Sequence, residues 1–151
     1  MRRLPPRIAR ELENREDELV ERARTLAAGL LGGKESREHG RDDEDGEGSR
    51  RMASKEGQLR NIQSMAEESD SWEAVKLFIR YQAARDQLRR DWAEEAVKQL
   101  EALQDHARAL APGQDPGLQR RVHMELVARV LGYAVRWHVW DLKKPKSEAR
   151  P

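Results

Sequence analysis

Apolar residues recur along this chain at spacings of three, four and seven, which is the period of one face of an α-helix. In the first thirty residues they are Ile8, Leu12, Leu19, Ala23, Leu26 and Leu30. Nowhere do apolar and polar residues alternate between turn signals, as they do in a half-buried strand. The pattern therefore predicts an all-α protein.

The supply of apolar side chains limits the core that such helices can build. Hydrophobic residues make up 37% of the 151 and charged residues 38%, which suits a small helical bundle better than a thick sandwich. Cysteine is absent, which excludes disulfides, thiolate nucleophiles and sulfur-ligated zinc. No stretch approaches the roughly 20 apolar residues of a membrane span, and the N-terminus turns acidic where a signal peptide needs an apolar run. We expect a soluble, cytoplasmic protein with no membrane partner.

Changes in composition divide the chain into four parts. Residues 1–33 are expected to form one long N-terminal helix that stops at a glycine pair. Residues 34–53 carry five basic and seven acidic groups and too few apolar side chains to fold, so they predict a flexible acidic linker. Residues 54–144 are expected to form a compact bundle of about four helices, and residues 145–151 a polar tail.

Helix-start signals place the four helices of the bundle. A side chain with a short polar end accepts a hydrogen bond from the first turn of a helix, and an acidic residue three positions later reinforces it. The expected starts are Ser54, Asp70 with Glu73, Asp91 with Glu94, and Asp115 with Pro116. The last helix is expected to run from about Pro116 to Leu142.

The chemistry of a catalytic site is missing from the sequence. The four histidines are His39, His106, His123 and His138. None of them stands four residues from another or three residues after a glutamate, so helical metal-binding patterns are absent. No glycine-rich phosphate loop follows a strand, and the carboxylates are scattered among basic residues. We therefore expect no enzyme activity, no cofactor and no metal.

Basic residues gather on the expected helices in positions that could grip a phosphate backbone. The candidates are Arg60, Lys76, Arg80, Arg85, Arg89, Arg129 and Arg136. Salt pairing along a helix is the competing interpretation for each: Arg129, for example, has a glutamate four residues before it. Arg80 and Arg85 have no acidic residue three or four positions away, so they are the strongest candidates.

Three segments, taken in order, carry a family resemblance. They are "GQLRNIQSM" (57–65), "KLFIRYQAAR" (76–85) and "ELVARVLGYAVRWH" (125–138). Together they resemble the small all-α subunit of type III-A CRISPR (Csm) effector complexes, over about residues 54–144. The matching positions are Gln58, Leu59 and Arg60, then Ile79, Tyr81, Ala83 and Arg85, then Leu126 through His138. Tyr133 and His138 stand further apart than the family's adjacent Tyr-His pair.

The resemblance implies a binding function without a catalytic step. Small subunits of this family stack as a short filament along the duplex of guide RNA and target RNA and hold its backbone without cutting it. The implied partners are guide RNA, target RNA, other subunits of the effector complex and further copies of the chain. The sister small subunit of type III-B complexes and a helical protein–protein adaptor remain alternatives. A DNA-binding regulator is a weaker one, because no helix-turn-helix can be placed.

Overall fold

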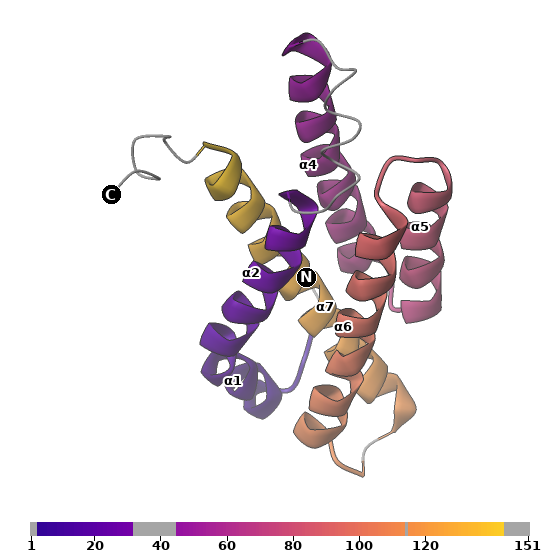
Figure 1. Ribbon diagram of the computed structural model, residues 1–151. Helices are drawn as coiled ribbons and strands as arrows, with labels where there is room; N and C mark the ends of the chain where they lie inside the picture. Colours follow the sequence, from indigo (N-terminus) through magenta and orange to yellow (C-terminus); the bar gives the residue numbers. More distant parts are fainter. Residues whose placement is uncertain (1–2, 32–44, 114, 144–151) are drawn as a thin grey trace.

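The computed structural model describes residues 3–31, 45–113 and 115–143, with only the backbone for residue 31 and residues 45–54. These parts contain six helices, α1, α2, α4, α5, α6 and α7, and no strand (Figure 1). The all-α prediction is confirmed. Among the described residues, no helix combines the length and the apolar character needed to cross a membrane.

The N-terminal segment forms two helices, where the sequence predicted one. α1 spans Pro6–Asn14 and α2 spans Glu16–Leu31. The backbone N–H of Arg15 bonds to the carbonyls of Leu12 and Glu13, which closes α1 before α2 begins. Leu12 and Leu19 are fully buried on either side of this break, so both helices keep an apolar face against the core. Apolar spacing alone does not detect such a break, because it is the same in one long helix and in two short ones.

α4 spans Asp45–Glu68 and begins inside the segment that the sequence assigned to a flexible linker. The linker prediction therefore fails from Asp45 onward, while residues 34–44 lie outside the described part of the chain. Ser54 is an interior residue of α4, so the helix start predicted there is also wrong. Helix nucleation is costly and extension is not. A turn anchored by buried Leu59 and Ile62 can therefore continue through polar residues that bury nothing themselves.

The next two helices begin close to the predicted positions, but with different caps. α5 spans Trp72–Ala84, and its N-cap is Ser71, whose hydroxyl accepts from the N–H of Ala74 at 3.1 Å. Asp70, the predicted cap, lies one residue too early. α6 spans Arg90–Leu110, so the predicted cap Asp91 is already inside the helix.

α7 is the longest helix and the centre of the fold. It spans Pro116–Lys143, and its predicted start is confirmed, because the Asp115 carboxylate accepts from the N–H of Leu118 at 2.8 Å. α7 packs against α2, α4 and α6, whereas α5 lies outside on α6 and α4 (Figure 1). The expected tail, residues 145–151, is outside the described part.

The N-terminal helices belong to the same core as the rest of the molecule. Ile8 and Leu19 join one buried cluster with residues of α4, α5, α6 and α7. The buried indole of Trp92 in α6 donates to the carbonyl of Leu26 in α2 at 2.9 Å. The expected bundle of four helices is therefore completed by α1 and α2. With few apolar residues available, the two sides of α7 are covered only when α2 packs along it.

Candidate nucleic-acid interface

The two basic residues in the middle of α5 are held by acidic residues of α6. The Lys76 ammonium lies 2.9 Å from Glu73 and 3.1 Å from Glu101. The Arg80 guanidinium donates twice to the carboxylate of Glu94, at 3.0 Å for each bond. These carboxylates raise the pKa of Lys76 and of Arg80, and Arg80 in turn lowers the pKa of Glu94. Arg80 was a strong candidate because it lacks a partner in its own helix; its partner comes from the neighbouring one.

The two arginines just after α5, Arg85 and Arg89, differ in exposure and in contacts. The Arg89 side chain is only 13% exposed, lies 3.4 Å from Asp91 and donates to the carbonyl of Gly29 in α2. It connects α2 to the start of α6, so it is a structural residue. Arg85 is exposed, with its guanidinium 5.4 Å from the centre of the Tyr81 ring. It makes no ion pair within the described residues.

The remaining candidates, on α4 and α7, are exposed or half-buried. Arg60 donates to Glu56 one turn earlier, at 3.1 Å, and Arg129 donates to Glu125 at 2.8 Å. Both are pairs within one helix, of the kind that contributes little in water. Arg136 is exposed above the ring of Tyr133, with a guanidinium-to-centroid distance of 5.5 Å.

Arg129 and Arg136 belong to a longer row of residues on α7. The row has spacings of four, four, three, four, four and three, which keeps its members on one side of a helix. We call it the α7 strip: Arg121, Glu125, Arg129, Gly132, Arg136, Trp140 and Lys143. Each member is half-buried or exposed, whereas the twelve buried residues of α7 lie outside the strip. From Arg121 to Lys143 the strip is about 33 Å long at 1.5 Å per residue, so it extends along most of one side of α7.

Contacts on both sides show where the α7 strip faces. The hydroxyl of Tyr133 donates to Glu16 of α2, and the indole of Trp137 donates to the Val20 carbonyl of α2 at 3.0 Å. On the other side Gly132 lies against Gln63 of α4, where an added Cβ would come within 3.1 Å of the amide nitrogen. The strip therefore faces outward between α2 and α4. Because Gly132 has no side chain, α4 can approach α7 closely at this position.

The α4 residue Arg60 lies at the level of Arg136. α4 and α7 run in opposite directions (Figure 1). Arg60 is one turn before Gln63 and Arg136 one turn after Gly132, so both are displaced from this contact toward the same end of the molecule. Of the seven predicted site residues, Arg129 and Arg136 therefore share one side of α7, and Arg60 of α4 lies at the level of Arg136.

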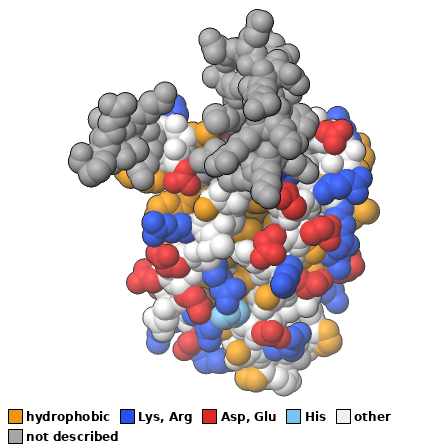
Figure 2. Space-filling view, in the orientation of Figure 1, with side chains coloured by type: hydrophobic (Ala, Val, Ile, Leu, Met, Phe, Trp, Pro, Cys, Tyr) orange, Lys and Arg blue, Asp and Glu red, His pale blue; other side chains and the backbone are white. Residues whose placement is uncertain are grey.

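The charge on the α7 strip has one dominant sign. It holds four cations and one carboxylate, and the exposed indole of Trp140 (56% of the residue) lies among them. On the face shown in Figure 2, by contrast, basic and acidic side chains are interspersed. Sequence analysis missed Arg121, Trp140 and Lys143, although their spacing from Arg129 and Arg136 contained the necessary signal.

The three described histidines, His106, His123 and His138, have different surroundings. His106 lies between two arginines, 3.0 Å from both Arg15 and Arg22, and burial and the Arg22 charge lower its pKa. His123 and His138 are buried. No group of three potential metal ligands occurs among the described residues.

No protein-family model matches this chain, and no curated protein or solved structure matches it either.

Proposed function

We propose that this chain is a non-catalytic subunit of a cytoplasmic ribonucleoprotein, of the type III CRISPR kind that its three segments resemble, and that it binds the RNA backbone through the α7 strip. The observation that carries the proposal is the excess of four cations over one carboxylate along one partly exposed helix face. Lysine and arginine on a rigid helix can contact successive phosphates without reading bases.

The surface that supports this proposal differs from the one the sequence favoured. Lys76, Arg80 and Arg89 are engaged with α6 and α2, so we assign them to the fold. Arg129 and Arg136 remain in the proposed interface, with Arg60 beside them. Guide RNA and target RNA are the proposed ligands, and other subunits and further copies of this chain are the proposed protein partners. A type III-B complex would use the strip in the same way.

A protein–protein adaptor is the second candidate, and a different surface favours it. On α5, Leu77 is 69% exposed and Tyr81 is 52% exposed, one turn apart on the outer side of the bundle. Two large apolar side chains exposed together are a common part of protein-binding surfaces. The adaptor function predicts contacts through this face of α5 and no need for RNA.

Salt-dependent RNA binding tests the proposal. Binding of an RNA duplex and of a single strand is measured by fluorescence anisotropy at about 50 and 200 mM salt, where counterion release lowers affinity steeply for each phosphate contact. The double variant Arg129→Gln/Arg136→Gln is expected to weaken binding about tenfold and to reduce the salt slope by roughly two. The matched control is Lys76→Gln/Arg80→Gln, which removes the same charge from α5.

The control separates a local interface from general electrostatic attraction. Equal losses in the two double variants would mean that only net charge matters, and the α7 strip would then have no special role. An absence of RNA affinity at the lower salt concentration, together with binding of partner proteins through Leu77 and Tyr81, would favour the adaptor.

A further inference from the structure

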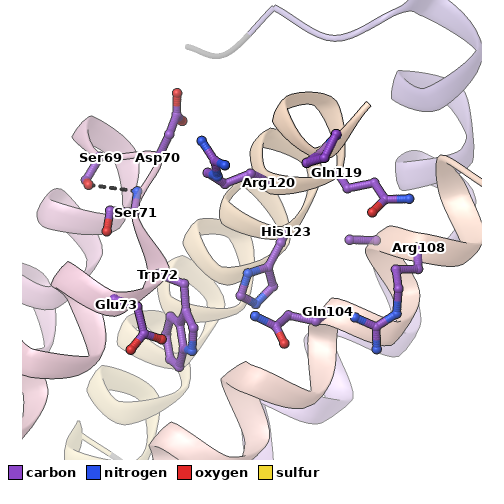
Figure 3. Close-up of a pocket in the computed structure, with 12 residues that line it drawn as sticks. Ser69, Asp70, Ser71, Trp72, Glu73, Gln104, Arg108, Gln119, Arg120 and His123 are labelled. Atoms are coloured by element: carbon purple, nitrogen blue, oxygen red, sulfur yellow. Dashed lines mark hydrogen bonds between the residues drawn. The ribbon is translucent and has the colours of Figure 1, made fainter. Parts of the chain in front are cut away.

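A cavity of about 670 Å³ lies at the N-terminal end of α7, where Gln119, Arg120 and His123 line it. Its walls come from the turn between α4 and α5, the second half of α6 and the first turns of α7 (Figure 3). The volume falls within the roughly 300–1,000 Å³ of small-molecule sites. The RNA-backbone function proposed above makes no use of it.

His123 supplies a hydrogen-bond acceptor to this cavity. The residue is 3% exposed, and its Nε2 lies 3.0 Å from the carbonyl of Leu100. A carbonyl only accepts, so Nε2 carries the hydrogen. Burial lowers the pKa of His123, which keeps the ring neutral near pH 7 and leaves a lone pair on Nδ1. Nδ1 makes no hydrogen bond with the described residues and is not one of the fully buried side-chain atoms, so it is open to the cavity that His123 lines. A ligand with an N–H or O–H group would satisfy it.

The neighbours of His123 favour a flat ligand. The Trp72 ring lies edge-on to the imidazole, with centroids 5.5 Å apart and planes at 74°. Its indole N–H donates to Glu101 at 3.0 Å, which fixes the ring. The amide of Gln104, which both donates and accepts, projects from α6 beside the imidazole (Figure 3). A planar ring with in-plane donors and acceptors, such as a nucleobase, matches this set of groups.

A cation stands at the edge of the same cavity. Arg120 lines it and is exposed, and it makes no ion pair in the described parts of the chain. The other lining cation, Arg108, is already paired with Asp105. Glu73 is engaged with Lys76 at 2.9 Å. Arg120 is therefore the group available to an anionic substituent, and arginine suits phosphate oxygens in particular.

We propose that this cavity binds a single nucleotide, with the base against His123, Trp72 and Gln104 and the phosphate toward Arg120. The nucleotide is either free or the terminal unit of an RNA strand, because the two share this chemistry. The site is separate from the α7 strip: Arg120 and Arg121 are neighbours in the sequence but point about 100° apart around the helix axis.

The test is a titration of the full chain with the four ribonucleoside 5′-monophosphates at fixed ionic strength, followed by NMR of the histidine side chains. At least one nucleotide is expected to bind saturably with a Kd below about 1 mM. The Nδ1 signal of His123 is expected to shift while that of His106 does not. Ribose 5-phosphate is expected to bind at least about tenfold more weakly, because it lacks the base. Short RNAs with and without a terminal phosphate show whether a strand end competes for the site.

Three variants locate the binding and keep it distinct from the backbone function. Gln104→Leu changes a half-buried side chain and is expected to fold and to weaken nucleotide binding about tenfold. Arg120→Gln is expected to weaken it about threefold or more, since each variant loses a hydrogen-bonding group. The control Arg121→Gln removes the adjacent charge; it is expected to leave nucleotide binding within about twofold and to weaken duplex RNA binding instead.

Four results would overturn the proposal: no saturable binding up to about 5 mM, binding without a change at His123, equal affinity for ribose 5-phosphate, or equal losses in Arg120→Gln and Arg121→Gln. None of these results bears on whether the α7 strip binds duplex RNA, which the salt-dependence experiment tests by itself.

Discussion

The basic face of α5 and the α7 strip look alike in the sequence and differ in the structure. Both place lysine and arginine at helical spacing on an amphipathic helix. On α5, Lys76 and Arg80 meet Glu101 and Glu94 from α6. On α7, the only carboxylate in the strip is its own Glu125. The same pattern thus joins two helices in one place and leaves an outward cationic surface in the other.

The difference shows what local charge counting measures. A search for acids three or four residues away detects partners within the same helix. Glu94 is 14 residues from Arg80, and only the packing of α5 on α6 brings the two together. A basic residue without a local partner is therefore a candidate for a tertiary ion pair as much as for a binding site.

The largest expected effect is a loss of stability on replacement of Arg89. This variant tests whether Arg89 stabilises the fold or binds RNA. Arg89→Ala removes a charged donor from the half-buried Gly29 carbonyl and is expected to lower the free energy of unfolding by about 1.5–3 kcal/mol. Chemical denaturation measures this loss. RNA affinity of the folded variant should stay within about twofold of the original. The adjacent exposed residue supplies the control: Arg90→Ala should change stability much less, and an equal loss would show that the Gly29 contact is unimportant.

A smaller effect is expected from the carboxylate within the α7 strip. Glu125→Gln removes the only negative charge of the strip and frees Arg129 from its 2.8 Å partner. RNA affinity should rise about threefold at low salt, because phosphate then meets less repulsion. Glu94→Gln, on the α5–α6 side, is the matched control and should leave RNA affinity unchanged. A loss of affinity in Glu125→Gln would mean that the pair positions Arg129 for binding.

Acidification should lower the stability of the folded chain and leave the RNA affinity of the α7 strip unchanged. Burial lowers the pKa of His106 and of His123 in the folded chain. Below the ordinary histidine value of 6.5, the unfolded chain therefore binds protons that the folded chain does not. Stability should be constant above that pH and decline as the pH falls below it. Denaturation curves between about pH 8 and 5.5 measure the decline.

The cations of the strip are arginine and lysine, two residue types whose ordinary pKa values lie well above this interval. RNA affinity of the folded protein should therefore stay level while stability declines. His106→Gln should reduce the decline, because it removes one of the two described histidines whose pKa is lowered. If stability instead increased as the pH fell, the two imidazoles would have to gain protons on folding.

The smallest effect is expected from exchanging the charges of one ion pair between α5 and α6. Arg80→Glu alone should lower the Tm, because it faces Glu94 with a like charge. Adding Glu94→Arg should recover most of this loss. RNA affinity should remain within about twofold in both variants. Failure of the second change to restore the Tm would show that the two side chains are not coupled in solution.

Much of the fold could be predicted because short-range rules determine it. The start of α7 is an example: an aspartate before a proline satisfies the first turn whatever surrounds it. The break at Arg15 and the early start of α4 could not be predicted in this way. The break at Arg15 leaves Leu12 and Leu19 in the same apolar register as one continuous helix, and α4 extends through residues that have no apolar pattern at all.

The sequence by itself determined that the chain is helical, where α7 begins, and that Arg129 and Arg136 share a face, because hydrogen bonding and side-chain direction within a helix depend on neighbours three to seven residues away. The tertiary structure alone decided that α1 and α2 complete the core, that α6 supplies the carboxylates that pair with Lys76 and Arg80, and that the outward side of α7 stays cationic. Those outcomes depend on which helices pack together, and the burial of apolar side chains scattered over the whole chain selects that packing.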